Sequence, residues 1–402
     1  MAIDRALARP GMLTEDEARQ LMMTAAASSI PTDALVSAAG RVRDTMRPFN
    51  NSNVVTYSRK VFINLVNLCR DTCSYCTYKK EPGDPLASMI NPEQVLAIAE
   101  AGRRAGCTEA LFVTGERPEQ RYPQVRDWLR SLGHPSTVDY VAEMSELVLE
   151  RTGLLPHTNA GSLTKKEMAL LKDTNPSMGV MLETSSERLM GAGMAHGGAP
   201  SKHPKVRIKT LEAAGELRIP MTTGILVGIG ETPDELVDSL FVIKKIHEKY
   251  GHIQEVIMQN FEPKPGTGMA HFAPAHKEYF LRAVALARLV LPVDMNIQVP
   301  PNLNPSVYGR YLDAGINDWG GISPVTIDHV NPEFPWPTIE EVRQVTESRG
   351  KKLRARLPVY PEFLDKKKGG DGGGFISERL RHYIGLLADE SGLVREGEER
   401  CT

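Results

Sequence analysis

Short apolar runs alternate with amphipathic stretches along most of the chain, a pattern that predicts strands followed by helices. The runs over residues 60–68 and 109–115 are rich in β-branched and aromatic side chains. Further strands are predicted over residues 154–161, 178–184, 221–230, 253–261, 295–300 and 320–326. Near-continuous apolar runs indicate strands buried on both faces, and intervening helices make such strands parallel. The series predicts an α/β fold, a TIM-type (βα) barrel that is complete or partial, with a doubly wound open sheet as the alternative.

Capping boxes, in which Thr or Asn precedes Glu or Gln by three residues, predict helices that begin after Thr14, Asn91 and Thr232. Thr164 opens another predicted helix. We therefore expect an N-terminal helical cap, the barrel and a C-terminal extension, over residues 1–56, 57–330 and 331–402.

The C-terminal extension has its own composition. Residues 364–375 form a charged, glycine-rich stretch, which predicts a flexible linker. Residues 376–389 predict one short helix beyond it.

Composition narrows the classes of function. Hydrophobic residues make up 41% of the chain and charged residues 24%, and the net charge of -2 argues against a general binder of nucleic acid or membrane surfaces. No apolar run approaches the roughly 18 residues that a membrane span requires. We therefore expect a cytoplasmic protein that acts on a small-molecule substrate, with no nucleic-acid or membrane partner.

Active sites of parallel α/β folds lie at the carboxyl ends of the strands. We therefore look for functional residues where the predicted strands end. The first strand leads directly into three cysteines, Cys69, Cys73 and Cys76, in the stretch "NLCRDTCSYCTY". Three thiolates so close together suit a 4Fe–4S cluster that keeps one iron open. A zinc site with His134 or His157 as fourth ligand is one alternative.

A redox pair made of Cys73 and Cys76 is the other alternative, although it leaves Cys69 unexplained. Cys107 precedes a predicted core strand and is expected to be a buried, small apolar residue. Cys401 is expected to lie in a frayed terminus.

The C-x-x-x-C-x-x-C spacing, with Tyr75 just before the third cysteine, resembles the signature of the radical S-adenosylmethionine (radical SAM) enzymes. The resemblance implies a 4Fe–4S cluster held by the three cysteines and SAM bound at the open iron. It further implies that several residues contact SAM. These are Tyr75 near the adenine, Thr114, Gly115 and Glu116 near the methionyl ammonium, Glu183 near the ribose, and the element "GILVGIGET" with Gly228 against the adenine.

A closer resemblance is to the FO synthase family, which forms 7,8-didemethyl-8-hydroxy-5-deazariboflavin (FO). The stretches that carry it, such as "PHTNAGSLTKKEMALLKDTNPSMGVMLETSSERL" and "GHIQEVIMQNFEPKP", run from about residue 60 to 300. The chain resembles the type of subunit called CofG. This implies a lyase that closes the deazaflavin ring of 5-amino-5-(4-hydroxybenzyl)-6-(D-ribitylimino)-5,6-dihydrouracil with release of ammonia, 5′-deoxyadenosine and methionine, as a step in deazaflavin coenzyme biosynthesis.

The resemblance also implies partners. A separate tyrosine-using radical SAM subunit of the CofH type supplies the substrate, and an electron donor such as a ferredoxin or flavodoxin reduces the cluster. Polar side chains at two strand ends are candidates for substrate binding: His157, Asn159, Gln259 and Asn260. We assign no catalytic residue. The tyrosine-using subunit itself and a non-catalytic zinc scaffold remain as alternative functions.

Overall fold

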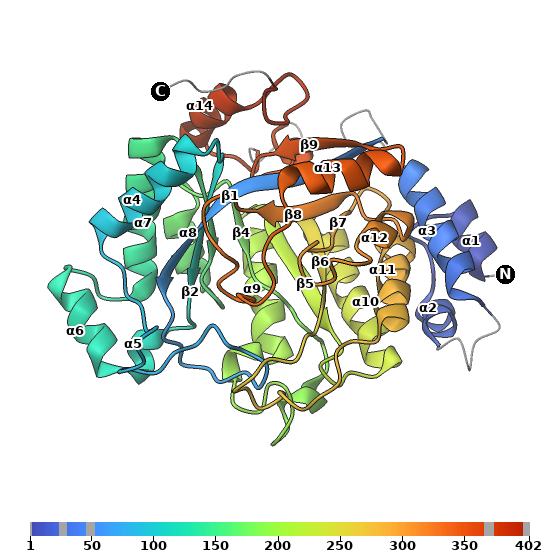
Figure 1. The fold of residues 1–402 in the computed structure, drawn as a ribbon, viewed down its shortest axis with the longest axis horizontal. Helices are drawn as coiled ribbons and strands as arrows, with labels where there is room; N and C mark the ends of the chain where they lie inside the picture. The colour runs from blue at the N-terminus through green and yellow to red at the C-terminus, as the bar shows by residue number, and fades with distance from the viewer. Residues whose placement is uncertain (1, 24–29, 46–52, 366–373, 397–402) are drawn as a thin grey trace.

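The computed structural model describes residues 2–23, 30–45, 53–365 and 374–396. Its strands form one parallel sheet in the order β2-β3-β4-β5-β6-β7-β8-β1-β9, and β2 also pairs with β1 (Figure 1). Eight strands therefore close into a barrel. The strands are β1 Val54–Val66, β2 Glu109–Thr114, β3 Leu155–Asn159, β4 Ser177–Gly179, β5 Met221–Val227, β6 Ile253–Asn260, β7 Asn296–Gln298, β8 Asp318–Ile322 and β9 Lys352–Arg356.

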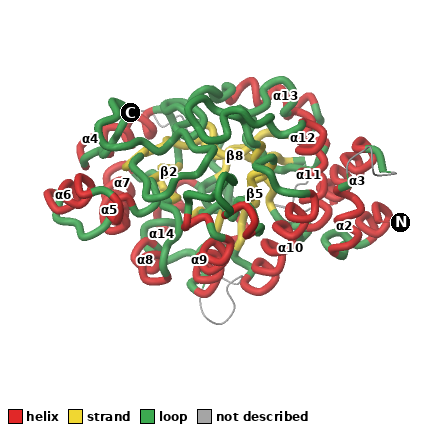
Figure 2. The backbone as a smooth tube through the Cα atoms, turned by 90° about the horizontal axis from the view of Figure 1, so that it is seen from below, coloured by secondary structure: helices red, strands yellow, loops and turns green. Residues whose placement is uncertain are grey.

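This closure confirms the predicted TIM-type barrel in its complete form, and the alternative of an open sheet is wrong. Helices surround the strands, as the end-on view in Figure 2 shows. The α-helices are α1 Ala2–Ala8, α2 Glu15–Met22, α3 Thr32–Thr45, α4 Pro92–Arg104, α5 Pro118–Arg121, α6 Pro123–Ser131, α7 Thr137–Thr152, α8 Lys165–Leu171, α9 Pro204–Glu216, α10 Pro233–Tyr250, α11 Lys277–Val290, α12 Gly309–Asp313, α13 Ile339–Ser348 and α14 Glu378–Leu387. Short 3-10 helices lie at Glu187–Met190, Pro200–Lys202 and Pro361–Phe363.

The predicted helix starts are confirmed. Thr14, Asn91, Thr164 and Thr232 are N-caps, and in each case the side chain accepts a hydrogen bond from the third helical residue. That residue's Glu or Gln side chain bonds back to the cap, which satisfies main-chain N–H groups that have no partner within the helix.

The N-terminal helices are attached to the barrel through α11. Arg282 of α11 is buried and donates to the carbonyl oxygens of Leu21, at 2.6 Å, and Ile30, at 3.0 Å. A buried guanidinium that binds two carbonyl groups fixes these segments relative to the barrel. No helix in the described residues is long and apolar enough to cross a bilayer.

The structure differs from the prediction at β9, which the sequence pattern did not indicate. β9 runs parallel to the first half of β1, with Val54 opposite Lys352 and Ser58 opposite Arg356. The sequence "KLRAR" lacks an apolar run because its arginines make ion pairs instead. Arg356 reaches Glu255 and Asp318, both at 2.7 Å.

The last predicted helix is confirmed as α14. It packs with Leu357, Val359 and Phe363 in a small apolar cluster at the end of the barrel where β9 lies (Figure 1). Most of the glycine-rich stretch 364–375, and Cys401, lie outside the described residues. The division of the chain into three domains stays a prediction.

Candidate functional site: a cysteine-lined cavity

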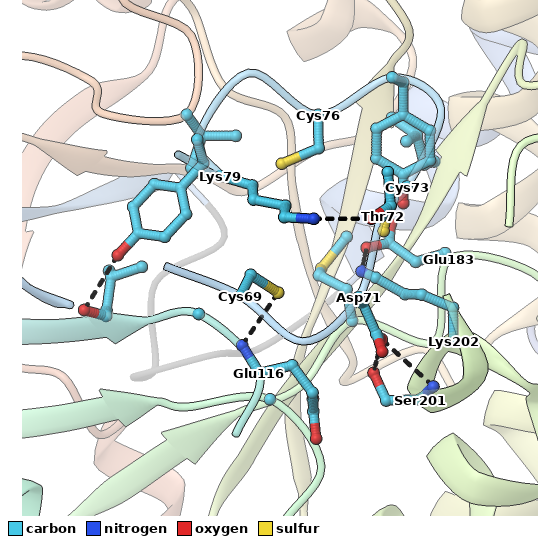
Figure 3. Close-up of a pocket in the computed structure, with 18 of the residues that line it drawn as sticks. Cys69, Asp71, Thr72, Cys73, Cys76, Lys79, Glu116, Glu183, Ser201 and Lys202 are labelled. Carbon is cyan, nitrogen blue, oxygen red and sulfur yellow. Dashed lines mark hydrogen bonds and ion pairs between the residues drawn. The ribbon is translucent and has the colours of Figure 1, made fainter. Parts of the chain in front are cut away.

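The loop after β1 carries the three cysteines at the carboxyl end of the barrel. Cys69, Cys73 and Cys76 line one cavity of about 410 Å³ (Figure 3). Main-chain hydrogen bonds fix the loop to its neighbours. Arg70 N–H donates to Glu116 at 2.8 Å, Thr72 N–H to Gly198 at 2.7 Å and Ser74 N–H to Ala195 at 2.9 Å. The cysteines are thus held in place by bonds to two other barrel loops.

Burial makes the thiols of Cys69 and Cys73 weaker acids. It raises the pKa of Cys69 to about 11 and that of Cys73 to about 12, although Lys202 opposes the shift at Cys73. Thiolates bind iron, so occupation of this site by a metal centre would release protons. Among the described residues, no three His, Cys, Asp or Glu side chains are grouped closely enough to hold a metal ion.

Cys107 behaves as predicted. It is buried between α4 and β2, does not line the cavity, and burial raises its pKa to about 12.

The "TGE" segment after β2 lies against the cysteine loop. Gly115 leaves no room for a side chain, because a Cβ there would lie 1.8 Å from the carbonyl oxygen of Leu68. The next main-chain N–H, that of Glu116, donates to Cys69 Sγ at 3.2 Å. This close approach explains why glycine stands at this position.

Glu116 has one free acceptor inside the cavity wall. Its Oε2 accepts from the N–H of Ser162 at 2.9 Å, while Oε1 is buried and accepts no hydrogen bond from any described residue. Arg117 Nε lies 3.7 Å from that oxygen, within ion-pair range only. A buried carboxylate oxygen without a donor suits a ligand that brings one, such as an ammonium group. The cavity therefore fits the amino group of SAM.

Glu183 stands where the chain leaves β4 and has a left-handed backbone, with φ of 64°. Its main-chain N–H donates to Gly224 and its carbonyl accepts from Leu226, both at 3.0 Å, so β5 imposes this conformation. β4 is shorter than predicted, because its ladder ends at Gly179. The carboxylate pairs with Lys202 in the cavity (Figure 3). Burial raises the pKa of Glu183, but the attraction of Lys202 prevails and keeps it below its ordinary value.

The glycine-rich turn after β5 is held by its own glutamate. Glu231 accepts from the N–H groups of Gly228, at 2.7 Å, and Ile229, at 2.9 Å. Gly228 has φ of 96° and faces Ala275 rather than the cavity, whereas Leu226 of the same element lines it.

Tyr75 lines the cavity, and His196 contacts its side chain. Its hydroxyl group lies 3.0 Å from His196 Nε2, and the two rings meet edge to face. The ring packs against the cluster that contains Leu226 and Phe261.

The substrate candidates divide between two cavities. Asn159, Gln259 and Asn260 line the cysteine cavity. His157 does not reach it and lines an adjoining cavity, to which Asn159 and Gln259 also contribute. Of the residues predicted to bind the cluster, SAM or the substrate, the structure brings all but His157 and Gly228 to the cysteine cavity. His134, the alternative zinc ligand, does not line it and lies 3.1 Å from Glu143.

Sequence reasoning missed several residues of the cavity wall. Asp71 accepts a hydrogen bond from the N–H of Ser201 at 3.2 Å. This bond joins the cysteine loop to the short 3-10 helix that precedes α9. Its position between Cys69 and Cys73 is a local signal in the sequence that it belongs to the site. Arg207, on α9, donates to the carbonyl oxygen of Ser201 at 2.8 Å and lies 3.9 Å from Glu116 Oε2. No local pattern marks it, because only the fold brings α9 to β2.

The comparisons with known proteins agree with this geometry. The sequence profile of the radical SAM superfamily matches residues 63–243. The chain is 47% identical to 7,8-didemethyl-8-hydroxy-5-deazariboflavin synthase of Methanopyrus kandleri over 85% of this chain and 100% of that protein. It is 43% identical to FO synthase of Streptomyces coelicolor over 97% of this chain, but it spans only 45% of that longer protein.

Solved structures share the fold. The FeFe-hydrogenase maturase HydG from Carboxydothermus hydrogenoformans superposes with a TM-score of 0.71 at 18% identity, over 97% of this chain and 86% of that one. Methylornithine synthase (PylB) does so with a TM-score of 0.67 at 19% identity, over 88% and 97%. The superfamily profile and the full-length match to the Methanopyrus protein show that the chain belongs to the radical SAM superfamily and, within it, to the FO synthase family.

Proposed function

We propose that this protein is the CofG-type enzyme of FO formation. It would convert 5-amino-5-(4-hydroxybenzyl)-6-(D-ribitylimino)-5,6-dihydrouracil into FO and release ammonia, which makes it a carbon–nitrogen lyase. The observation that carries the proposal is the single cavity that gathers Cys69, Cys73, Cys76, Glu116 and Glu183 at the carboxyl end of the barrel. The 47% identity to the Methanopyrus synthase over its full length supports it.

Membership of the superfamily implies a 4Fe–4S cluster and SAM as cofactors. When bound, they supply a carbon-centred radical that removes a hydrogen atom from the substrate. We assign the cluster to the three cysteines. Glu116 Oε1 would accept from the amino group of SAM, and Glu183 would accept from its ribose hydroxyl groups.

The residues of the chain would orient the substrate and keep water away from the radical. Tyr75, Leu226 and Phe261 form an apolar side of the cavity that limits access of water. Asn159 and Gln259 offer neutral donors and acceptors to the substrate without adding charge beside a radical.

Formation of the hydroxybenzyl adduct requires a second radical SAM site. The residues printed here provide one C-x-x-x-C-x-x-C motif, and they match 45% of the Streptomyces FO synthase. We propose that a separate tyrosine-using radical SAM subunit of the CofH type makes the hydroxybenzyl adduct, and that a ferredoxin or flavodoxin delivers the electron.

The test uses the protein reconstituted with iron and sulfide without oxygen. Reduced enzyme, SAM and the preformed adduct are expected to give fluorescent FO and 5′-deoxyadenosine in parallel. Product formation only from tyrosine and the ribitylamino-uracil would assign the chain to the other half of the pathway. A colourless protein that holds zinc and cleaves no SAM would refute the radical reaction altogether.

A further inference from the structure

A second cavity of about 170 Å³ adjoins the cysteine cavity. The walls of both cavities include Asn159, Met181, Gln259, Val330 and Asn331, so the two cavities adjoin at these residues. We call the second cavity the lower chamber, because its wall residues Lys60, Glu109 and His157 come earlier along the first three strands than the residues that line the cysteine cavity. Its remaining wall comes from several elements, including Lys60, Glu109, His157, Gln298, Trp336 and Arg356.

His157 presents an unprotonated nitrogen in this chamber. The Ser177 hydroxyl group donates to the carbonyl oxygen of Pro358 at 2.6 Å, so it must accept from His157 Nδ1, which lies 2.7 Å away. Burial lowers the pKa of His157 to about 4, so the ring is neutral and Nε2 carries no proton. Space beside Nε2 is kept by Gly179, where a Cβ would lie 3.0 Å from that nitrogen.

Three side-chain amides of the chamber are also unused. Asn159, Gln259 and Gln298 make no side-chain hydrogen bond to any residue that the structure describes. Each amide offers both a donor and an acceptor, and Gln298 is 7% exposed. A buried amide without a partner costs free energy unless a ligand or water satisfies it.

Four charged residues of the chamber form ion pairs, and the fifth, Asp328, accepts hydrogen bonds from the side chains of Asn302 and Asn331 and from the N–H of Val330. Lys60 lies 3.1 Å from Glu109, and Arg356 lies 2.7 Å from Glu255. Paired charges disfavour an ionic ligand, because a new charge would compete with an existing partner. A bare imidazole nitrogen, three amides and compensated charges suit a neutral chain of hydroxyl groups, each of which donates and accepts.

We propose that the lower chamber binds the polyhydroxylated ribityl chain of the substrate, with a hydroxyl group donating to His157 Nε2 and others bonding to Gln298 and Gln259. This inference rests on the proposed function. It assigns the other end of the substrate to the cysteine cavity, where the ring closes.

The experiment measures binding separately from turnover. Cluster-loaded enzyme with SAM is titrated with FO, which keeps the ribityl chain, and with the analogue in which a methyl group replaces that chain, and quenching of deazaflavin fluorescence gives both Kd values. Wild type is expected to bind FO at least about tenfold more tightly than the methyl analogue, since one or two buried hydrogen bonds are at stake. The variants Gln298→Leu, which keeps volume, and Gly179→Ala, which blocks Nε2, are expected to reduce this ratio to within about threefold of unity. Gln124→Leu on the exposed face of α6 is the matched control and is expected to keep the wild-type ratio.

Two results would overturn the proposal. One is an equal Kd for both ligands in wild type, or no binding of either. The other is an unchanged ratio in both chamber variants. Turnover of the adduct by wild type is scored in a parallel assay, so a failed chamber and a failed enzyme assignment give different outcomes.

Discussion

The main-chain N–H of Glu116 donates to the sulfur of Cys69 across 3.2 Å, so the loop after β2 contacts the first cysteine of the motif directly. This contact exists only because Gly115 lets the two loops approach. Gly115→Ala would place a methyl group 1.8 Å from the carbonyl oxygen of Leu68. We expect the loops to separate at a cost of about 3 kcal/mol or more, with loss of most bound iron.

Iron and sulfide content after reconstitution, together with the thermal midpoint, tests this expectation. Gly385→Ala in α14 is the control, since no atom lies within 4 Å of its added Cβ and alanine favours a helix by about 1 kcal/mol. Normal iron content in Gly115→Ala would show that the close approach is dispensable.

Variants of the cavity cysteines are expected to differ from a variant of Cys107 in cluster content and activity. Cys69→Ala, Cys73→Ala and Cys76→Ala are each expected to lose the cluster absorbance and 5′-deoxyadenosine formation together, because each thiol lines the same cavity. Cys107→Ala removes a buried thiol outside the cavity and is expected to keep both, with a stability loss of about 1 kcal/mol. Retention of a four-iron cluster in a triple variant would contradict the assignment.

The Glu183–Lys202 pair permits a double-variant cycle. Lys202→Met leaves the Glu183 carboxylate buried without its partner, and Glu183→Gln does the reverse to Lys202. Each single change is expected to destabilise the fold by about 3 kcal/mol, and the double change by less than their sum. SAM affinity, measured by equilibrium dialysis on cluster-loaded protein, is expected to fall about tenfold in Glu183→Gln and to stay low in the double variant. Recovery of affinity in the double variant would show that Glu183 acts only through Lys202.

We expect His252 to cause part of the loss of folding stability at acidic pH. Burial, together with repulsion from His247, lowers its pKa from 6.5 to about 4. Between pH 6.5 and 4, His252 binds a proton in the unfolded chain but stays neutral in the folded protein. Stability is therefore lost as pH falls from 6.5 towards 4, by up to about 3 kcal/mol.

His252→Phe is expected to flatten this part of the curve of thermal midpoint against pH. His382→Phe, on the exposed side of α14, is expected to leave the curve as in wild type. Parallel curves for wild type and His252→Phe would refute the role of His252.

Local sequence patterns predicted the elements and the cysteine site well. Capping boxes such as that of Asn91 involve residues three apart, and the cysteines lie in one loop, so short stretches contain the whole signal. The remaining features depend on contacts between distant segments. β9 could not be predicted because Arg356 is stabilised by Glu255 and Asp318, which lie far away in the sequence. The same reason hid Arg207 and the lower chamber.

β1 forms its ladder with strands from both parts of the chain, since Val54 pairs with Lys352 while Lys60 pairs with Glu109. During translation, the cysteine loop emerges from the ribosome well before β8, which pairs with the first half of β1 at Thr56 and Asp318 and closes the barrel. Until β8 has been made, the barrel seam stays open. A nascent chain would thus expose its thiols while the cavity is unfinished, which favours delivery of iron and sulfide after release from the ribosome.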